Sequence, residues 1–218
     1  MFNKILIVVD GDIDLNNYVA IAKAISENVN PKDDIYLSQG PMDVLDHSCS
    51  KFAFGGKMSI DATIKFDEEL RCTKPLDGAI HLDHEKVKAQ FIEISSMNST
   101  LLKLGISVVF IAVKKSRINH VKELHQKLFS LPDFAAVKIA IYVEHTINTN
   151  DIADCIWRFA NNIDPKRDSF IIEAANENCI SHIGFDGTRK TKELDNFHRD
   201  WPNILISDDA TIKAIDEK

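Results

Sequence analysis

The residues with the clearest chemical potential form an acidic loop near the start of the chain. Asp10, Asp12 and Asp14 alternate with other residues directly after a hydrophobic run at residues 5–9. Two carboxylates spaced in this way after a buried strand can act as a nucleophile and as an acid or base beside a bound Mg²⁺ ion. The loop could therefore carry phosphoryl-transfer chemistry.

Haloacid-dehalogenase-like phosphatases use such an arrangement, and Asp208 and Asp209 could supply their later metal-binding acids. The threonine-rich continuation of that loop is missing, however, and residues that would bind the phosphate are not evident. The acids also precede a predicted helix, where carboxylates accept hydrogen bonds from free backbone N–H groups and stabilise the helix dipole. We therefore favour a structural role for the loop, with a phosphatase using Asp10 and Asp12 as the alternative.

Two further motifs do not meet the requirements of the sites that they suggest. A phosphate-binding loop needs a glycine five positions before Gly56 and a Ser or Thr after the following lysine, but Lys51 and Met58 stand there. A flexible turn is the better interpretation of this segment. The pair His81 and His84 has no second group of ligands in the sequence to complete a metal site, and we interpret it as the solvated start of a helix.

The composition of the chain excludes several classes of protein. Its 218 residues are 44% hydrophobic and 27% charged, which is ordinary for a globular protein. A net charge of −7 without a basic block argues against a nucleic-acid surface. No apolar run approaches the ~20 residues that a membrane span needs. The four cysteines have no C-x-x-C spacing, which favours reduced thiols and a cytoplasmic location.

The elements that would position these residues are present twice. Residues 4–40 match residues 138–174 at a constant offset of 134 positions. Each segment has a short apolar run ending in an acid, then an apolar stripe of helical period, and then a proline, Pro31 or Pro165. This pattern predicts a buried strand, an amphipathic helix and a second strand. The stripes are Tyr18, Ile21, Ala22 and Ile25, and Ile152, Cys155, Ile156 and Phe159, with Asn16 and Asn150 as predicted N-caps.

The two segments also share polar residues at fixed spacing, which strand and helix patterning does not explain. Each predicted helix ends in N-x-N/D-P-K-x-D, and each copy continues to D-A/G-T-x-K at an offset of 125. Short Asp and Thr side chains fix turns by hydrogen-bonding to the backbone. We interpret the match as an internal duplication. The motif positions to which we assign a structural role are Asn28, Pro31, Asp34, Lys57, Asp61, Thr63 and Lys65, and Asn162, Asp164, Pro165, Asp168, Asp186, Thr188 and Lys190.

The segment between the copies continues the alternation of helix and strand. We expect a helix over residues 83–104, a strand over residues 106–113, and a helix over residues 116–130 with His120 and His125 at the surface. The order predicts an α/β fold in which a mostly parallel sheet has helices on both faces and contains two copies of a βαβ module.

The sequence divides into three units that could form one compact domain. Residues 1–75 hold the first module, residues 76–136 the central α/β unit, and residues 137–218 the second module.

Together these motifs resemble the C-terminal domain of the UbiD family, the 3-octaprenyl-4-hydroxybenzoate carboxy-lyase-like decarboxylases. In the first copy the resemblance rests on residues 5–14, 28–34 and 57–65. The second copy matches better in places, over residues 157–168 and 183–190, followed by Arg199-Asp200-Trp201-Pro202. The duplicated form is longer than the usual pattern of the family.

The resemblance implies a decarboxylase for aromatic or unsaturated carboxylic acids, such as intermediates of ubiquinone and menaquinone biosynthesis. Members of the family use prenylated FMN with a divalent metal such as Mn²⁺ and with K⁺. Their cofactor-binding and catalytic residues lie in the N-terminal and middle regions, so the resemblance implies no cofactor, metal or catalytic residue in this segment.

The role that the resemblance implies for the chain is structural. It would be the C-terminal assembly part of a longer enzyme, with the N-terminal flavin-binding part and further copies of the enzyme as partners. A stand-alone interaction module remains the other alternative.

Overall fold

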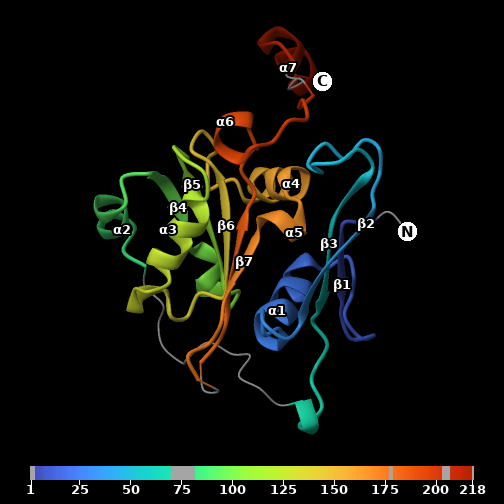
Figure 1. The fold of residues 1–218 in the computed structure, drawn as a ribbon, viewed down its shortest axis with the longest axis vertical. Helices are drawn as coiled ribbons and strands as arrows, with labels where there is room; N and C mark the ends of the chain where they lie inside the picture. Colours follow the sequence, from blue (N-terminus) through green and yellow to red (C-terminus); the bar gives the residue numbers. More distant parts are fainter. Residues whose placement is uncertain (1–2, 70–81, 177–178, 203–206, 218) are drawn as a thin grey trace.

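The computed structural model describes residues 3–69, 82–176, 179–202 and 207–217 (Figure 1). Its first part is a three-stranded sheet with the strand order β1-β3-β2. Strand β1 runs parallel to β3, and β2 runs antiparallel to β3. The elements of this part are β1 (Ile5–Val8), α1 (Tyr18–Asn28), β2 (Ile35–Pro41), β3 (Phe54–Asp61) and the 3₁₀ helix η1 (Asp67–Glu69).

The rest of the described chain is built around a five-stranded sheet with the order β4-β5-β6-β8-β7. Its strands are β4 (Ile94–Asn98), β5 (Val108–Val113), β6 (Ile139–Glu144), β7 (Ser169–Ile172) and β8 (His182–Asp186). Its helices are α2 (His84–Gln90), η2 (Thr100–Leu104), α3 (His120–Leu128), η3 (Pro132–Phe134), α4 (Ile152–Asn162), α5 (Pro165–Asp168), α6 (Lys192–Asp195) and α7 (Asp209–Asp216). None of the helices in the described ranges is long and apolar enough to cross a membrane.

Helices cover both faces of the five-stranded sheet, which confirms the α/β class (Figure 1). On one face, Val87 of α2 and Leu124 of α3 pack with Ile111 and Tyr142 of the sheet in one hydrophobic cluster. On the other face lie α4, α5 and the three-stranded sheet with α1. The small sheet therefore acts as a further layer that closes one side of the large sheet.

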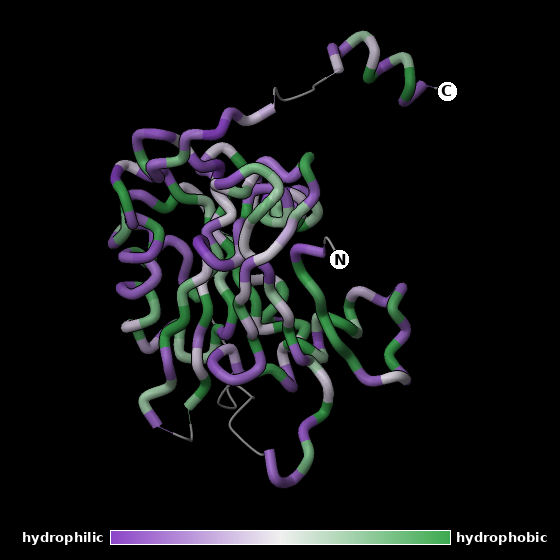
Figure 2. Tube along the Cα trace, turned by 45° about the vertical axis from the view of Figure 1, so that its right-hand side comes forward, coloured by the Kyte–Doolittle hydropathy of each residue, from purple (hydrophilic) through white to green (hydrophobic). Residues whose placement is uncertain are grey.

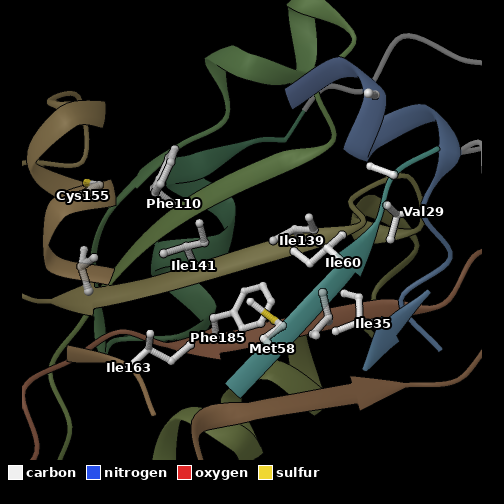
Figure 3. Close-up of a cluster of buried hydrophobic side chains, with 14 of the residues drawn as sticks. Val29, Ile35, Met58, Ile60, Phe110, Ile139, Ile141, Cys155, Ile163 and Phe185 are labelled. Atoms are coloured by element: carbon white, nitrogen blue, oxygen red, sulfur yellow. The ribbon is translucent and has the colours of Figure 1, made fainter. Parts of the chain in front are cut away.

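A single core joins the two sheets (Figure 3). Met58 and Ile60 of β3 pack there with Ile183 and Phe185 of β8. These four residues are counterparts at the offset of 125, so equivalent positions of the two segments meet in the same core. Val29 and Ile163, which are counterparts at the offset of 134, also lie in this core, and both are fully buried.

Both sheets contain parallel and antiparallel strands, whereas the sequence predicted a mostly parallel sheet. Of the six strand pairs in the described ranges, three are parallel and three are antiparallel. The reason is connectivity: β2 leads to β3, and β7 to β8, without a helix between them, so each second strand returns antiparallel to its neighbour. Each segment is therefore a strand, a helical part and two strands rather than a simple βαβ unit.

The predicted helix over residues 83–104 is wrong beyond Gln90. Strand β4 follows α2 and pairs antiparallel with β5, and η2 comes after it. The segment from Ser95 to Thr100 is rich in Ser, Asn and Thr, which are poor formers of helix interiors. Pairing with β5 also buries Ile94 and Met97 in the cluster beneath α2 and α3. The strand thus gains both ladder hydrogen bonds and apolar burial.

His120 and His125 are buried, although we expected them at the surface. The His125 ring is fully buried, and its Nδ1 lies 2.9 Å from the Tyr142 hydroxyl. Burial lowers the pKa of His125 to about 3, so the ring is neutral at pH 7. His120 Nδ1 accepts a hydrogen bond from the backbone N–H of Ser116, and α3 begins at His120 rather than at residue 116.

The helix starts differ from the prediction by one residue. The N-caps are Asn17 and Asp151, not Asn16 and Asn150, because Asn16 N–H is bonded to the Asp14 carboxylate in a turn that precedes the helix. Tyr18 was expected to face the core but is 79% exposed. Only the later part of α1 reaches the core between the sheets, so its first turn is left at the surface. Ile156 of the second stripe is also exposed, whereas Cys155 is fully buried as predicted.

Candidate functional site

The shared polar positions form a compact network in the second segment. Lys190 Nζ lies 3.3 Å from Asp186 Oδ1 and 3.6 Å from Asp168 Oδ2. The hydroxyl of Thr188 donates a hydrogen bond to Asp186, and the backbone N–H of Asp164 donates to Asp168 Oδ2 at 2.8 Å. The motif thus connects the end of β8 to the turn between α4 and α5.

The first segment repeats this network residue for residue. Lys65 Nζ lies 3.1 Å from Asp61 Oδ2 and 3.4 Å from Asp34 Oδ1. The Thr63 hydroxyl donates to Asp61 Oδ1 at 2.6 Å, and the backbone N–H of Asn30 donates to Asp34 Oδ2 at 2.6 Å. Five pairs of equivalent residues therefore make the same contacts in both segments.

The asparagine near the end of each first helix is also used in the same way. Asn28 Nδ2 donates to the carbonyl of Ala62 at 3.0 Å, and Asn162 Nδ2 donates to the carbonyl of Gly187 at 2.9 Å. In both segments the asparagine holds the backbone between the Asp and the Thr of the D-A/G-T-x-K motif.

The acid after each first strand binds the same backbone position of that motif. Asp10 Oδ2 accepts from the N–H of Ile64 at 2.8 Å, and Glu144 Oε1 accepts from the N–H of Arg189 at 2.7 Å. One carboxylate oxygen of Asp10 is thereby committed to the backbone, which differs from the free nucleophile that a phosphatase requires.

The two networks differ in how far water can reach them. The side chain of Asp61 is 40% exposed, whereas that of Asp186 is 12% exposed. Lys115 also reaches Asp186, at 3.7 Å. Burial raises the pKa of Asp186, but the charges of Lys190 and Lys115 outweigh burial and hold this pKa below its usual value. Asp168, Asp186 and Lys190 line a cavity of about 130 Å³ beside α3 and α6.

The remaining acids and the lysine of the predicted set lie apart from these networks. Asp14 Oδ1 accepts from the N–H of Asn16 at 2.9 Å, and Asp208 caps α7 by accepting from the N–H of Thr211. Lys57 Nζ donates to the carbonyl of Asn3 at 3.0 Å. The side chain of Asp12 forms no hydrogen bond or ion pair with the described residues. Of the predicted histidine pair, His81 lies outside the described part of the chain.

The Gly55-Gly56 segment is part of β3 and not the predicted turn. Gly56 N–H donates to Asp164 Oδ2 at 3.1 Å, and a Cβ at Gly56 would overlap Asp164 and the backbone nitrogen of Lys166. The N-terminal end of α5 thus rests directly on the backbone of β3. A glycine pair gives no sequence signal for such a contact, because its partner lies more than 100 residues away.

Two lysines that the sequence did not single out hold the segments together reciprocally. Lys4 Nζ donates to the carbonyl of Ala160 in α4 at 3.0 Å, and Lys138 Nζ donates to the carbonyl of Ser26 in α1. Lys4 and Lys138, and likewise Ser26 and Ala160, are counterparts at the offset of 134. The contact is therefore approximately two-fold, with each segment using the same residue against the other.

A family model described as the 3-octaprenyl-4-hydroxybenzoate carboxy-lyase C-terminal domain, UbiD_C, matches residues 1–62 and 81–189. The chain belongs to this family. The match includes every residue of both networks except Thr63, Lys65 and Lys190.

Two curated relatives show how this UbiD C-terminal domain relates to longer proteins. An uncharacterized protein of Helicobacter pylori strain J99 is 31% identical over 208 residues, which cover 92% of this chain and 30% of that protein. An uncharacterized protein of Aeropyrum pernix is 25% identical over 119 residues, covering 50% of this chain and 24% of that protein. The chain thus spans less than a third of the length of these relatives.

Solved structures of low similarity carry UbiD-class names. Vanillic acid decarboxylase of Sedimentibacter hydroxybenzoicus has a TM-score of 0.49 and 12% identity, covering 82% of this chain and 42% of that one. An evolved dimeric form of the UbiD-class enzyme HmfF from Pelotomaculum thermopropionicum, in complex with prFMN, has a TM-score of 0.47 and 20% identity. It covers 62% of this chain and 28% of that one.

The two polar networks of this UbiD C-terminal domain do not fit the metal or the flavin phosphate of the family. Within the described ranges, no group of three or more His, Cys, Asp or Glu side chains could hold a metal ion. The carboxylates that do gather, such as Asp168 and Asp186, face Lys190 rather than an open coordination site. We therefore derive no step through either group from these residues.

Proposed function

We propose that this chain is the structural and assembly part of a cytoplasmic UbiD-like decarboxylase, which acts on aromatic or unsaturated carboxylic acids of the quinone-biosynthesis type. The observation that carries the assembly role is an apolar sheet surface left open by the fold. Its expected partners are the N-terminal, flavin-binding part of the same enzyme and a second copy of the chain.

The open surface is the outer face of the three-stranded sheet. Met58 and Ile60 point into the core, so the alternating residues of the neighbouring strands face outward. Leu6, Val8 and Tyr36 lie on that outer side and are 46%, 42% and 61% exposed. We call these three residues the open face. Figure 2 shows the hydrophobic stretch of β1 close to the N-terminus, at the outside of the molecule.

The edge of the same sheet is open as well. Strand β1 pairs with β3 on one side and with no described strand on the other. Unpaired strand edges and contiguous exposed apolar patches are typical of surfaces that meet another chain. The curated relatives are more than three times as long as the part that they share with this chain, so further domains are available to cover it.

The isolated chain is expected to self-associate through the open face. Replacing Leu6 and Tyr36 together with glutamate should shift it to a monomer with an unchanged circular dichroism spectrum, because the charges would have to be buried in the interface. Light scattering coupled to size exclusion measures the mass. Ile92→Glu is the matched control, since Ile92 is 91% exposed in the loop before β4 and should leave the mass unchanged. A strict monomer at high concentration would contradict the proposal.

The chain alone is expected neither to retain flavin nor to decarboxylate. Flavin phosphate needs backbone N–H groups, a basic clamp or a metal with free carboxylates, and the carboxylates of both networks are engaged by lysines. The purified chain can be mixed with reduced prenylated FMN, Mn²⁺ and K⁺ and then desalted. Stoichiometric flavin absorbance after desalting, or release of carbon dioxide from an aromatic acid, would overturn the non-catalytic role.

We also infer that residues 1–75 and 137–218 are duplicated modules, with residues 76–136 as a central unit, and that the shared motif residues are structural. Three features support this inference: the equivalent networks, the reciprocal lysines Lys4 and Lys138, and the core shared by counterpart residues. Substitution of the corresponding lysines, Lys65 and Lys190, tests how much each network contributes to the free energy of unfolding.

A further inference from the structure

A second cavity, of about 460 Å³, lies outside both polar networks. It is bounded by α4 and by the segments that follow β6 and β8, with Lys4 at one side. Glu144 is the last residue of β6, and Arg189 comes three residues after the end of β8. Ligands of open α/β sheets bind outside the carboxyl ends of parallel strands, which is where this cavity lies.

Both tryptophans of the chain line this cavity. Trp157 is 56% exposed, so part of its indole ring is free to receive a ligand. The Trp201 ring is held in place, because its Nε1 donates to the carbonyl of Lys190 at 2.7 Å. The guanidinium of Arg189 lies over this ring, 5.6 Å from its centroid. The cavity therefore combines two flat apolar surfaces with a cation.

Arg189 is the cation of the cavity that is available to an anion. Lys4 pairs with Asp46 at 2.8 Å, and Arg158 pairs with Asp154 at 3.3 Å. Arg189, in contrast, forms no ion pair with any residue in the described part of the chain; its guanidinium meets the Trp201 ring and, at 3.5 Å, the carbonyl of Pro202.

The carboxylate of Glu144 lies at the wall of the same cavity. Its Oε1 accepts from the backbone of Arg189 and from Asn162. Its Oε2 is buried and has no hydrogen-bond partner among the described residues. Because this oxygen is shielded from solvent, the carboxylate forms part of the cavity wall without offering Oε2 to a ligand.

We propose that this cavity binds a purine mononucleotide, with its base against Trp157 and its phosphate paired with Arg189. Bases stack on aromatic side chains and arginine planes, and arginine is well suited to phosphate. The size of the cavity favours a base with a sugar and a phosphate over a single-ring anion. This binding function is separate from the assembly role.

Tryptophan fluorescence is a direct probe, because the two tryptophans of the chain both lie at the site. Titration with GMP, and in parallel with AMP, should change the emission in a saturable way. Guanosine and inorganic phosphate should each bind at least about tenfold more weakly than GMP, because each lacks one of the two recognised parts. No saturable change with either nucleotide, or tighter binding of phosphate alone or of benzoate, overturns the proposal.

Two variants locate the binding, with affinities measured by calorimetry. Arg189→Met keeps an apolar side chain over Trp201. It should lower the affinity for GMP at least about tenfold, because a charged hydrogen bond to the phosphate is lost. Trp157→Leu changes an exposed position and should weaken the binding of GMP by a similar factor. It tests the site independently if Arg189→Met fails to fold. Arg117→Met removes an equal charge from a half-exposed arginine outside the cavity and should leave the affinity unchanged. Equal affinities in all three variants place the ligand elsewhere and overturn the assignment.

Discussion

Alanine at position 56 is expected to destabilise the protein by about 3 kcal/mol, the upper end of the usual range for overpacking. The added Cβ would overlap Asp164 Oδ1 and the backbone nitrogen of Lys166, and it would lie 2.8 Å from Lys166 Cβ. A flexible side chain could rotate away, but the nitrogen belongs to the first turn of α5. Relief therefore requires α5 to move away from β3, which breaks the bond from Gly56 N–H to Asp164.

Chemical denaturation followed by circular dichroism measures this effect. Gly11→Ala is the matched control, because no atom lies within 4 Å of the Cβ that it would add. Its unfolding free energy should change by less than about 0.5 kcal/mol, as at ordinary surface positions. Similar unfolding midpoints for the two variants would show that α5 does not rest on β3 as described.

Replacing Lys190 with methionine is expected to cost about 3–5 kcal/mol, the range for breaking a buried ion pair by removal of one partner. The Lys190 side chain is 2% exposed, and its ammonium serves both Asp168 and Asp186, which are 3% and 12% exposed. It also donates to the carbonyls of Asp186 and Thr188. Methionine fills a similar volume but removes one cation and its hydrogen bonds from these acceptors, leaving Asp168 to Arg167 and Asp186 to Thr188 and Lys115.

The equivalent substitution in the first segment, Lys65→Met, should cost less, about 1–2 kcal/mol. Water can hydrate Asp61, whose side chain is 40% exposed, whereas Asp186 is only 12% exposed. The other acid of each network, Asp34 or Asp168, is buried. An equal or larger loss in Lys65→Met, measured in the same denaturation experiment, would contradict both the burial argument and the ranking of the two networks.

Local signals in the sequence predicted the elements that carry the motifs. The strand that ends at Glu144, the helix that ends at Asn162 and the proline turn after it are all found where periodicity and proline chemistry place them. These signals depend only on neighbours along the chain. Strand β4 was missed because it is stabilised by pairing with β5, and a short sequence window around Ile94 contains no information on that partner.

The amino-acid sequence by itself predicted the family and the α/β class, because both follow from residue types at fixed spacing along the chain. The tertiary structure alone decided that Asp186 is nearly buried while Asp61 borders solvent, that Gly56 lies under α5, and that both tryptophans meet at one cavity. The reason is physical. An offset states that two residues are counterparts, but burial, strand direction and contacts between segments depend on which distant part of the chain packs against each of them.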